Sequence, residues 1–325
     1  MELLTANHQT ALLPPELTVI SITSRCNSKC IYCDSWYKKP VDPKLNDLFM
    51  MLEAIKNLGC STIHVGCGEG DSLLRKDFGK FIEKCIELDF TTQFQTNGIL
   101  ATKDILEPIL SMGPMHITLS FDSFTPSVYE KIRGIPYKLV DQALKTLISL
   151  REDYPRLSLS ATCVITALNL SEIVEIVKKF NDLGIPLGLQ PYHPKVCNGP
   201  NGLPELLIEK NRETELRDII AQVAQLKTAG YQLGGSHFWF QWMPNFLLYG
   251  KLPEGYQCNA GYRALTIDSN LDVLSCWMRK PVGNILNEPV EDIWYSDHFM
   301  RERIKMQTLD CPGCWLASYV ERWQI

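Results

Sequence analysis

The segment TSRCNSKCIYCDSW (residues 23–36) places three cysteines within eight positions, at the spacing C-x3-C-x2-C. It overlaps the end of LTVISIT (residues 17–23), whose apolar and β-branched residues are typical of a buried strand. Three thiols this close together on a loop that leaves a strand favour a metal site, because a disulfide framework uses an even number. Three thiolates can hold three irons of a [4Fe–4S] cube. Such clusters are normally held by four cysteines, so the fourth iron would be open to an external ligand.

Two other interpretations of this loop remain open. In one, the three cysteines are packing residues. In the other, they are three of the four ligands of a zinc ion. Zinc motifs usually pair two C-x2-C knuckles, and the sequence has no nearby pair that completes this one.

The composition limits the class of protein. The chain has 325 residues, of which 45% are hydrophobic and 21% are charged, as in ordinary globular proteins, and its length predicts one large domain and a smaller one. A net charge of −5 at pH 7 argues against a general nucleic-acid binder. No apolar run approaches the roughly 18 residues of a membrane span, and the first residues show no secretion signal. We therefore expect a cytoplasmic protein whose twelve cysteines stay reduced.

The pattern of residues 17–235 predicts an α/β fold. Short apolar or β-branched runs alternate with amphipathic stretches such as 47–59 and 139–152. The expected strands are 17–23, 62–66, 91–96, 116–121, 157–165 and 186–192. Consecutive strand–helix units imply a parallel sheet with right-handed crossovers. Six units are too few for a closed eight-stranded barrel and predict a partial (β/α)6 TIM-like barrel. In residues 169–184, Asn169 suits a helix N-cap and Gly184 suits a C-cap.

The sequence changes in character near residue 235. ALTIDSNLDVLSC (264–276) predicts a β-hairpin around a Ser-Asn turn, and residues 290–307 predict a helix before CPGCW (311–315). The aromatic run FWFQW (238–242) is expected to pack at the domain junction. We predict an N-terminal tail at 1–16, a partial barrel at 17–235 and a small hairpin-plus-helix domain at 236–325.

The three-cysteine loop resembles the signature of the radical S-adenosylmethionine (SAM) superfamily, C-x3-C-aromatic-x-C or close to it. The matching residues are Cys26, Cys30, Tyr32 and Cys33. The resemblance implies that the three cysteines hold a [4Fe–4S] cluster whose open iron binds the amino and carboxylate groups of SAM. Reduction then cleaves SAM to a 5′-deoxyadenosyl radical, which abstracts a substrate hydrogen atom. Tyr32 would lie against the adenine, and a role as a loop anchor is equally open.

Further segments at the expected strand ends support the resemblance, since barrel folds place their chemistry there. In VGCGEGDSLLR, residues Gly66, Gly68 and Glu69 match a GGEP-like segment that contacts the SAM amine, although Cys67 intrudes and Gly70-Asp71 replaces the proline. A simple turn is the other interpretation of this segment.

Four more residues match family positions that contact SAM, and three of them, Asn97, Arg133 and Ile165, also have a structural interpretation. Asn97 would contact the ribose, or form an ordinary Asn-Gly turn. Ser120 would contact the ribose or the carboxylate. Arg133 would bind the methionine carboxylate through its guanidinium, or lie on the surface. Ile165 would border the adenine, or belong to the core.

A second cysteine set lies near the C-terminus. Its members, at C-x17-C-x34-C-x2-C spacing, are Cys258, Cys276, Cys311 and Cys314. Four thiolates saturate a metal site, and tetrahedral zinc remains an alternative. The arrangement resembles the twitch domain of radical SAM enzymes, a shortened SPASM domain, and implies one auxiliary [4Fe–4S] cluster. SPASM domains carry further cysteines after this motif, so we expect the twitch type.

The resemblance implies an oxidative reaction. An auxiliary cluster can accept the unpaired electron of the substrate radical that hydrogen abstraction leaves, which favours oxidation or radical cross-linking. A purely structural cluster is the other interpretation.

Related enzymes modify peptides, dehydrogenate an aminocyclitol or cyclise GTP. The two C-terminal glycines of the cyclase are absent, and the long barrel favours a larger substrate. We therefore expect a peptide substrate and a thioether, carbon–carbon or backbone-excision product. Dehydrogenation of a small polyol or aminocyclitol, and a non-catalytic iron–sulfur scaffold or redox sensor, are the alternatives.

The expected partners and catalytic groups are less specific. Because the first strand starts at residue 17, no room is left for a leader-binding module, so we expect a separate leader-peptide recognition protein or direct binding. A flavodoxin or ferredoxin would donate the electron. LQPYHP (189–194) presents Tyr192 and His193 at a strand end. His193 would act as a general base, or as a hydrogen-bonded loop residue. Cys197 would donate a hydrogen atom, or pack.

Overall fold

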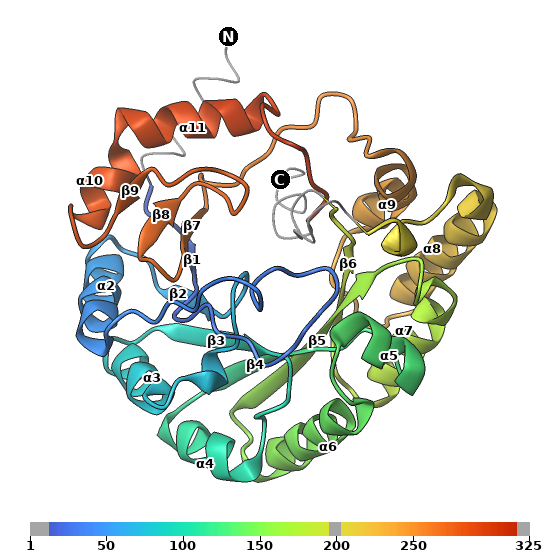
Figure 1. Cartoon of the computed structure of the whole chain (residues 1–325), viewed down its shortest axis with the longest axis horizontal. Coiled ribbons are helices and arrows are strands. Elements are labelled where there is room, and N and C mark those ends of the chain that lie inside the picture. Colours follow the sequence, from blue (N-terminus) through green and yellow to red (C-terminus); the bar gives the residue numbers. More distant parts are fainter. Residues whose placement is uncertain (1–12, 195–202, 317–325) are drawn as a thin grey trace.

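One curved sheet of nine strands runs through the described part of the chain, residues 13–194 and 203–316 of this computed structural model (Figure 1). The strands are β1 (Leu17–Ile20), β2 (Thr62–Val65), β3 (Thr91–Thr96), β4 (Met115–Ser120), β5 (Leu157–Ile165), β6 (Leu187–Pro191), β7 (Ala264–Ile267), β8 (Asp272–Leu274) and β9 (Gly283–Asn284). Their order in the sheet is β6-β5-β4-β3-β2-β1-β7-β8-β9. Strands β1 to β6 are all parallel, which confirms the expected partial barrel.

Helices surround the sheet on its outer side (Figure 1). They are α2 (Leu45–Asn57), α3 (Phe78–Glu87), α4 (Lys103–Met112), α5 (Pro126–Arg133), α6 (Tyr137–Asp153), α7 (Ile173–Asp182), α8 (Glu213–Thr228), α9 (His237–Tyr249), α10 (Val290–Tyr295) and α11 (Asp297–Gln307). Short 3₁₀ turns are η1 (Ser72–Leu74), η2 (Leu170–Glu172), η3 (Pro204–Leu206) and η4 (Lys210–Arg212). Within the described ranges, no helix combines the length and apolarity that crossing a membrane requires.

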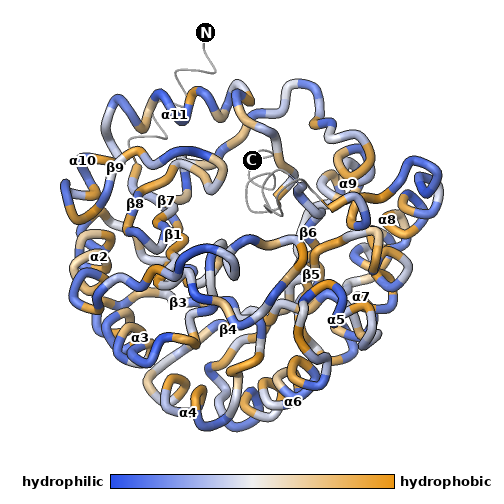
Figure 2. The backbone as a smooth tube through the Cα atoms, in the orientation of Figure 1, coloured by the Kyte–Doolittle hydropathy of each residue, from blue (hydrophilic) through white to orange (hydrophobic). Residues whose placement is uncertain are grey.

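Hydrophobic periodicity explains why each helix packs on the sheet. In α2, Leu48, Met51, Leu52 and Ile55 recur at three- and four-residue spacing, and all four are fully buried. The strands alternate instead: in β5, every second residue is buried. Figure 2 shows the hydrophobic residues of β5 and β6 in orange, whereas the loop after β1, in the middle of the ring, is mostly hydrophilic.

The strand residues that alternate with the buried ones form polar contacts between neighbouring strands. The ring nitrogens of His116 lie 2.8 Å from the hydroxyls of Ser158 and Ser160 on the neighbouring strand. Gln95 Nε2 donates to Ser120 Oγ at 2.9 Å. The partial barrel therefore has an apolar outer layer against the helices and polar groups on the opposite face of its strands.

The C-terminal hairpin extends the barrel sheet. Strands β7 and β8 pair antiparallel, as the sequence predicted. Strand β7 also pairs in parallel with β1, with Leu17 opposite Ala264 and Ile20 opposite Ile267. The two parts of the chain thus share one sheet, and the boundary near residue 235 stays a prediction.

Two local expectations need correction. Asn169 does not cap a helix with its side chain, because its Oδ1 accepts from Thr166 N and its Nδ2 donates to the carbonyls of Asp122 and Val164. Residues 290–307 form two helices, since Ser296 interrupts them and caps α11 by accepting from Phe299 N at 3.0 Å. The aromatic run itself forms part of helix α9, which also contains Pro244.

Two other local expectations are confirmed. Gly184 ends its helix with a φ of 61°, in the left-handed region. Helix α9, which contains the aromatic run, packs against α8 of the predicted barrel part. On its other side the indole nitrogen of Trp239 donates to the Trp315 carbonyl at 3.2 Å, and that of Trp315 donates to the Trp239 carbonyl at 3.0 Å.

Candidate active site

The three-cysteine loop is fixed by the C-terminal end of α5. The Ile31 amide donates to the Ile132 carbonyl at 2.9 Å, and the Ser28 hydroxyl donates to the Arg133 carbonyl at 2.9 Å. Gly134 follows with a φ of 65°, and a Cβ atom there would lie only 2.6 Å from the Lys29 carbonyl oxygen. Only glycine therefore allows the helix end and the loop to approach this closely.

Polar groups contact each of the three thiols. Cys26 Sγ lies 3.8 Å from Asn97 Nδ2, and Cys33 Sγ lies 3.4 Å from Ser35 Oγ. Cys30 Sγ lies 3.2 Å from Ser28 Oγ and 3.6 Å from an Arg133 guanidinium nitrogen. Burial raises the pKa of the Cys26 thiol to about 12, so a thiolate there requires a bound cation. This donor set fits an iron–sulfur cluster, whose sulfur ligands accept hydrogen bonds.

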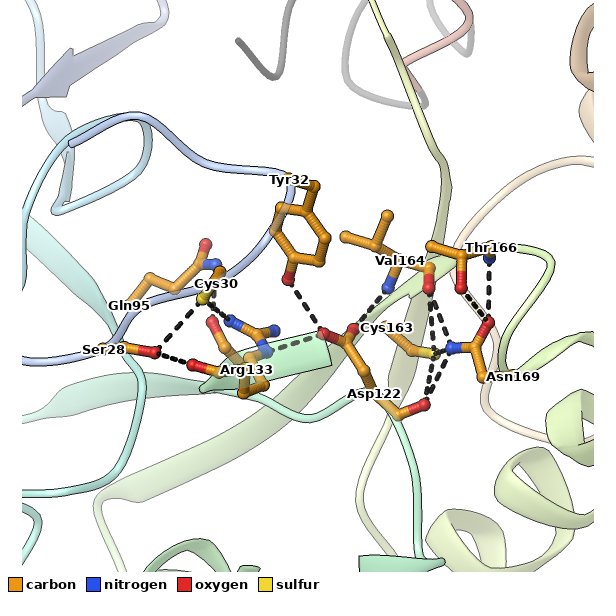
Figure 3. Close-up of polar contacts among 11 residues, drawn as sticks. Ser28, Cys30, Tyr32, Gln95, Asp122, Arg133, Cys163, Val164, Thr166 and Asn169 are labelled. Carbon is orange, nitrogen blue, oxygen red and sulfur yellow. Dashed lines mark hydrogen bonds and ion pairs between the residues drawn. The ribbon is translucent and has the colours of Figure 1, made fainter. Parts of the chain in front are cut away.

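Asp122 connects the residues around this loop (Figure 3). Its fully buried carboxylate accepts from the Tyr32 hydroxyl at 2.8 Å and from the Val164 amide at 2.8 Å. Its Oδ2 also lies 2.6 Å from Arg133 Nε. The Arg133 guanidinium stands 5.5 Å from the centre of the Tyr32 ring. One carboxylate thus holds two side chains that the resemblance assigns to SAM.

Sequence reasoning missed Asp122. It lies two residues after Ser120, directly after the C-terminal end of β4, and this position was the available signal. The sequence could not indicate its partners, because Tyr32 and Val164 are 90 and 42 positions away. Asp71 was missed in the same way: its buried carboxylate accepts from Thr96 Oγ1 at 2.9 Å and from Asn97 N at 2.8 Å.

The other predicted SAM contacts lie in different environments. Asn97 donates to Asn27 Oδ1 at 2.8 Å and so holds the cysteine loop. Ser120 accepts from Gln95. Ile165 is fully buried in the main hydrophobic core, and its carbonyl accepts from the Tyr192 amide. The structure thus brings Tyr32, Asn97 and Arg133 to the cysteine loop. Ile165 has the surroundings of a core residue.

The glycine-rich segment lies between the cysteine loop and the C-terminal hairpin. A Cβ atom on Gly70 would lie 2.3 Å from the Thr23 carbonyl oxygen, and one on Gly68 would lie 2.5 Å from the Trp277 ring. Glu69 Oε2 accepts from the Ser269 hydroxyl at 2.8 Å. The carboxylate predicted to face the SAM amine therefore contacts the hairpin.

Gly66, the first match in this segment, faces the third strand. Its φ is 76°, and a Cβ atom there would lie 3.0 Å from both the Gln95 carbonyl oxygen and the Ser72 hydroxyl. Its amide donates to the Ile20 carbonyl at 2.9 Å. Because Gly66 has no side chain, the segment after β2 can pack directly against Gln95 and Ser72.

The four C-terminal cysteines surround one small cavity. Their neighbours in its wall are Tyr256, Met278, Arg279, Met306 and Leu309. Burial raises the pKa of the Cys258 thiol to about 12. The described residues contain no group of three metal-binding side chains arranged around a single ion. The shared cavity is compatible with a cluster held by all four thiolates.

The predicted catalytic residues lie beyond the end of β6. Tyr192 is buried, and its hydroxyl accepts from the Leu203 amide at 3.2 Å. His193 is 3% exposed, and neither of its ring nitrogens has a hydrogen-bond partner among the described residues. Burial lowers its pKa to about 3, which leaves the ring uncharged and only weakly basic. Among the residues that the structure describes, no hydrogen-bond partner supports the loop-residue alternative for His193. Cys197 lies outside the described residues.

The family model of the radical SAM superfamily matches residues 20–187, just over half of the chain. These residues span β1 to the start of β6 and include the cysteine loop. The chain belongs to the radical SAM superfamily of enzymes. A model of an iron–sulfur cluster-binding domain, the SPASM type, matches residues 258–315 and contains the second cysteine set.

Curated relatives of this radical SAM protein match part of the chain. The PqqA peptide cyclase of Granulibacter bethesdensis is 26% identical over 125 residues, which are 38% of this chain and 33% of that protein. A probable GTP 3′,8-cyclase of Methanocaldococcus jannaschii is 26% identical over 183 residues, 54% of this chain and 58% of that protein. The chain thus spans about a third to somewhat more than half of these relatives.

A solved structure resembles nearly the whole radical SAM chain. The crystal structure of Streptococcus suis SuiB bound to precursor peptide SuiA superposes with a TM-score of 0.71 at 18% identity. The match covers 97% of this chain and 73% of that one. The likeness therefore includes the C-terminal hairpin and helices, and it establishes the fold.

The family determines the cofactors of the radical SAM protein. A [4Fe–4S] cluster and SAM belong to its barrel domain, and an auxiliary iron–sulfur centre belongs to its SPASM-type domain. The polar cysteine loop and the four-cysteine cavity are the two places whose donors fit these groups. The assignment of individual ligands and SAM contacts stays a prediction.

Proposed function

We propose that this radical SAM enzyme oxidatively modifies a peptide by abstracting a hydrogen atom at the barrel and transferring an electron to the auxiliary site. The observation that carries the proposal is the pair of cysteine sets on one continuous sheet. The first follows β1, and Cys276 of the second follows β8, two strands away across β7. A rigid connection of this kind keeps two redox centres at a constant separation.

At the first site, the cofactors supply a 5′-deoxyadenosyl radical when bound. The chain would hold them through Cys26, Cys30 and Cys33. Arg133 would attract the SAM carboxylate, since a guanidinium matches carboxylate geometry. Asp122 fixes Arg133 Nε at 2.6 Å and leaves the outer guanidinium nitrogens to face Cys30 and a ligand. The buried surroundings exclude water, which protects a reactive radical from side reactions.

At the second site, the four cysteines would saturate an auxiliary cluster. The wall contains two methionines and a leucine, and three of the four cysteines are buried, whereas Cys311 is half-buried. A saturated centre suits electron transfer because it leaves no position for substrate coordination. A structural cluster and a zinc ion are the competing assignments, and both predict that substrate oxidation does not depend on this site.

The packing between the two sites supports their cooperation. Trp277 directly follows Cys276, and its ring covers Gly68 of the segment predicted to contact SAM. Ser269, in the hairpin turn, donates to Glu69. The segment predicted to contact SAM and the hairpin that carries Cys276 therefore pack directly against each other through Trp277 and Glu69.

The names of similar proteins support a peptide substrate. One curated relative is a PqqA peptide cyclase, and the SuiB structure contains its precursor peptide. The proposed product is a cross-link, a thioether or an excised backbone segment. A separate leader-peptide recognition protein and a flavodoxin or ferredoxin would complete the system, in the cytoplasm.

The test is anaerobic reconstitution followed by counting iron and assaying products. The wild type should hold about eight irons per chain, as two [4Fe–4S] cubes require. It should form 5′-deoxyadenosine and change the mass of a peptide encoded next to its gene by the loss of two hydrogens or by excision. Oxidation of small polyols but not of peptides would replace the peptide assignment. SAM cleavage with zinc in the C-terminal site would overturn the electron-acceptor role.

A further inference from the structure

A cavity of about 200 Å³ lies between the end of β6, the C-terminal end of α9 and the turn between the last two cysteines. Figure 1 shows the segment after α11 descending to the region where β6 ends beside α9. The residues that line the cavity are Tyr192, His193, Pro194, Leu206, Leu207, Ile208, Phe246, Leu247, Leu248, Gly250, Pro312 and Gly313. None of them is a cysteine or a predicted SAM contact.

The walls of this cavity connect it to both cysteine sets. Tyr192 and Leu206 belong to the buried apolar cluster that also contains Cys30 and Tyr32 of the first loop. On the other side, Pro312 and Gly313 lie between Cys311 and Cys314 in the sequence. A group inside the cavity would therefore stand between the radical-forming loop and the auxiliary site.

The chemistry of the walls indicates what the cavity accepts. Most of the lining is apolar, and the Phe246 ring lies 4.8 Å from the His193 ring. Within residues 13–194 and 203–316, both ring nitrogens of His193 are buried and lack a hydrogen-bond partner, and burial keeps the ring neutral by lowering its pKa to about 3. A buried polar group without a partner is unfavourable, so an occupant that supplies a hydrogen bond would stabilise this wall. A neutral imidazole both donates and accepts one hydrogen bond.

We propose that this cavity binds an aromatic side chain that carries a hydroxyl group, as part of the substrate. An apolar cavity of about 150 Å³ is large enough for benzene, and the additional volume here accommodates a hydroxyl and the carbon that attaches the ring to its backbone. The apolar walls favour the ring, and His193 provides the partner for the hydroxyl. This inference rests on the proposed peptide-modifying function and assigns the substrate residue that is positioned between the two cysteine sets.

The first experiment measures binding of two small probes to the anaerobically reconstituted enzyme by saturation-transfer NMR. p-Cresol presents the ring with its hydroxyl, and toluene presents the ring alone. We expect p-cresol to bind about fivefold more tightly than toluene, the effect of one hydrogen bond. We also expect p-cresol to leave the affinity for SAM unchanged. Equal affinities would overturn the role of His193, and binding of neither probe would overturn the site.

Three variants locate the binding. Leu248→Trp fills the cavity and should abolish binding of both probes. Leu226→Trp adds the same side chain to a similarly half-buried position on α8 that does not line the cavity, and it should change nothing. His193→Phe keeps the ring and removes the nitrogens, so toluene should bind as before while the advantage of p-cresol disappears. Melting temperatures identify any variant whose fold is disturbed.

The binding assay separates this inference from the proposed function. If p-cresol binds at the cavity but no peptide is modified, the aromatic site stands and the peptide assignment fails. If a peptide is modified while p-cresol neither binds nor competes with it, the function stands and the site is wrong. If p-cresol competes with the peptide but not with SAM, and Leu248→Trp raises the KM for the peptide, both stand.

Discussion

The two cysteine sets differ in how the chain assembles them. The first lies within eight consecutive residues on one loop, so its spacing is already present in the unfolded chain. The second combines Cys258, Cys276 and the pair at 311 and 314, which meet only after the hairpin and helices α10 and α11 have packed. Closing long loops carries an entropic cost that local contacts avoid. The first site is therefore a property of one loop, and the second is a property of the fold.

The two sets also differ in their surroundings. Side chains of Ser28, Arg133 and Asn97 reach the sulfurs of the first loop. The second set faces mainly methionine and leucine side chains, and the sulfur of Cys258 accepts from the Ala260 amide. Because hydrogen bonds to sulfur and solvent exposure set the potential of a cluster, the two sites are expected to have different potentials.

The largest effects should come from removing each cysteine set in turn. The variant Cys26/Cys30/Cys33→Ala should lose about four irons per chain and all 5′-deoxyadenosine formation. The variant Cys258/Cys276/Cys311/Cys314→Ala should lose the same amount of iron but still cleave SAM, with no oxidised peptide. Iron analysis and liquid chromatography measure both. Cys85→Ala, at a buried cysteine of helix α3, is the control and should keep all the iron.

The next largest effect concerns the buried carboxylate that organises the first site. Asp122→Asn leaves the Arg133 guanidinium without its ion-pair partner in a buried position, so we expect a loss of about 3 kcal/mol of stability and weaker SAM binding. Calorimetry and equilibrium dialysis measure the two. Asp141→Asn removes an exposed i,i+4 pair with Lys145 and should cost less than about 0.5 kcal/mol. Equal effects of the two variants would show that Asp122 does not organise the site.

A smaller effect should reveal the contact between the glycine-rich segment after β2 and Trp277 of the C-terminal domain. Gly68→Ala places a methyl group against the Trp277 ring at a φ of 130°, so we expect a destabilisation of about 1–3 kcal/mol in chemical denaturation. Adding Trp277→Ala should recover part of it, as the double variant removes the collision. Gly255→Ala has a φ of 75° with open space around it and reports the cost of the backbone conformation alone. Additive effects at residues 68 and 277 would contradict the contact.

The smallest effect is a shift in reduction potential, which tests whether hydrogen bonds to the sulfurs distinguish the first cysteine set from the second. Asn97→Leu removes the side-chain amide whose Nδ2 donates to Cys26 Sγ at 3.8 Å. A hydrogen bond of about 0.5–1.5 kcal/mol corresponds to a shift of about 20–60 mV for one electron. Since a hydrogen bond to sulfur favours the reduced cluster, we expect the potential of the SAM-binding cluster to fall and that of the auxiliary cluster to stay constant. Redox titration monitored by electron paramagnetic resonance distinguishes the two clusters.

Much of the fold was predictable because it depends on local pattern. The six strands lie where alternating or apolar runs predicted them, and the helices follow three- and four-residue periodicity. The hairpin was also predictable from its turn. Its parallel pairing with β1 was not, since nothing in residues 264–267 specifies a partner 247 positions earlier in the chain. The split between α10 and α11 depends on one serine, which a longer helical pattern obscured.

The sequence by itself determined the chemistry of the cysteine loop, because C-x3-C-x2-C spacing, Tyr32 and the following glycine-rich segment are short-range features. The tertiary structure alone decided that Asp122 joins Tyr32 to Arg133, that Glu69 contacts Ser269 and that the end of β6, helix α9 and the Pro312–Gly313 turn enclose a cavity. Each of these depends on where separate segments pack. Residue types at fixed spacing encode the ligands of a site, whereas burial and long-range contacts, which arise only on folding, decide which groups surround them.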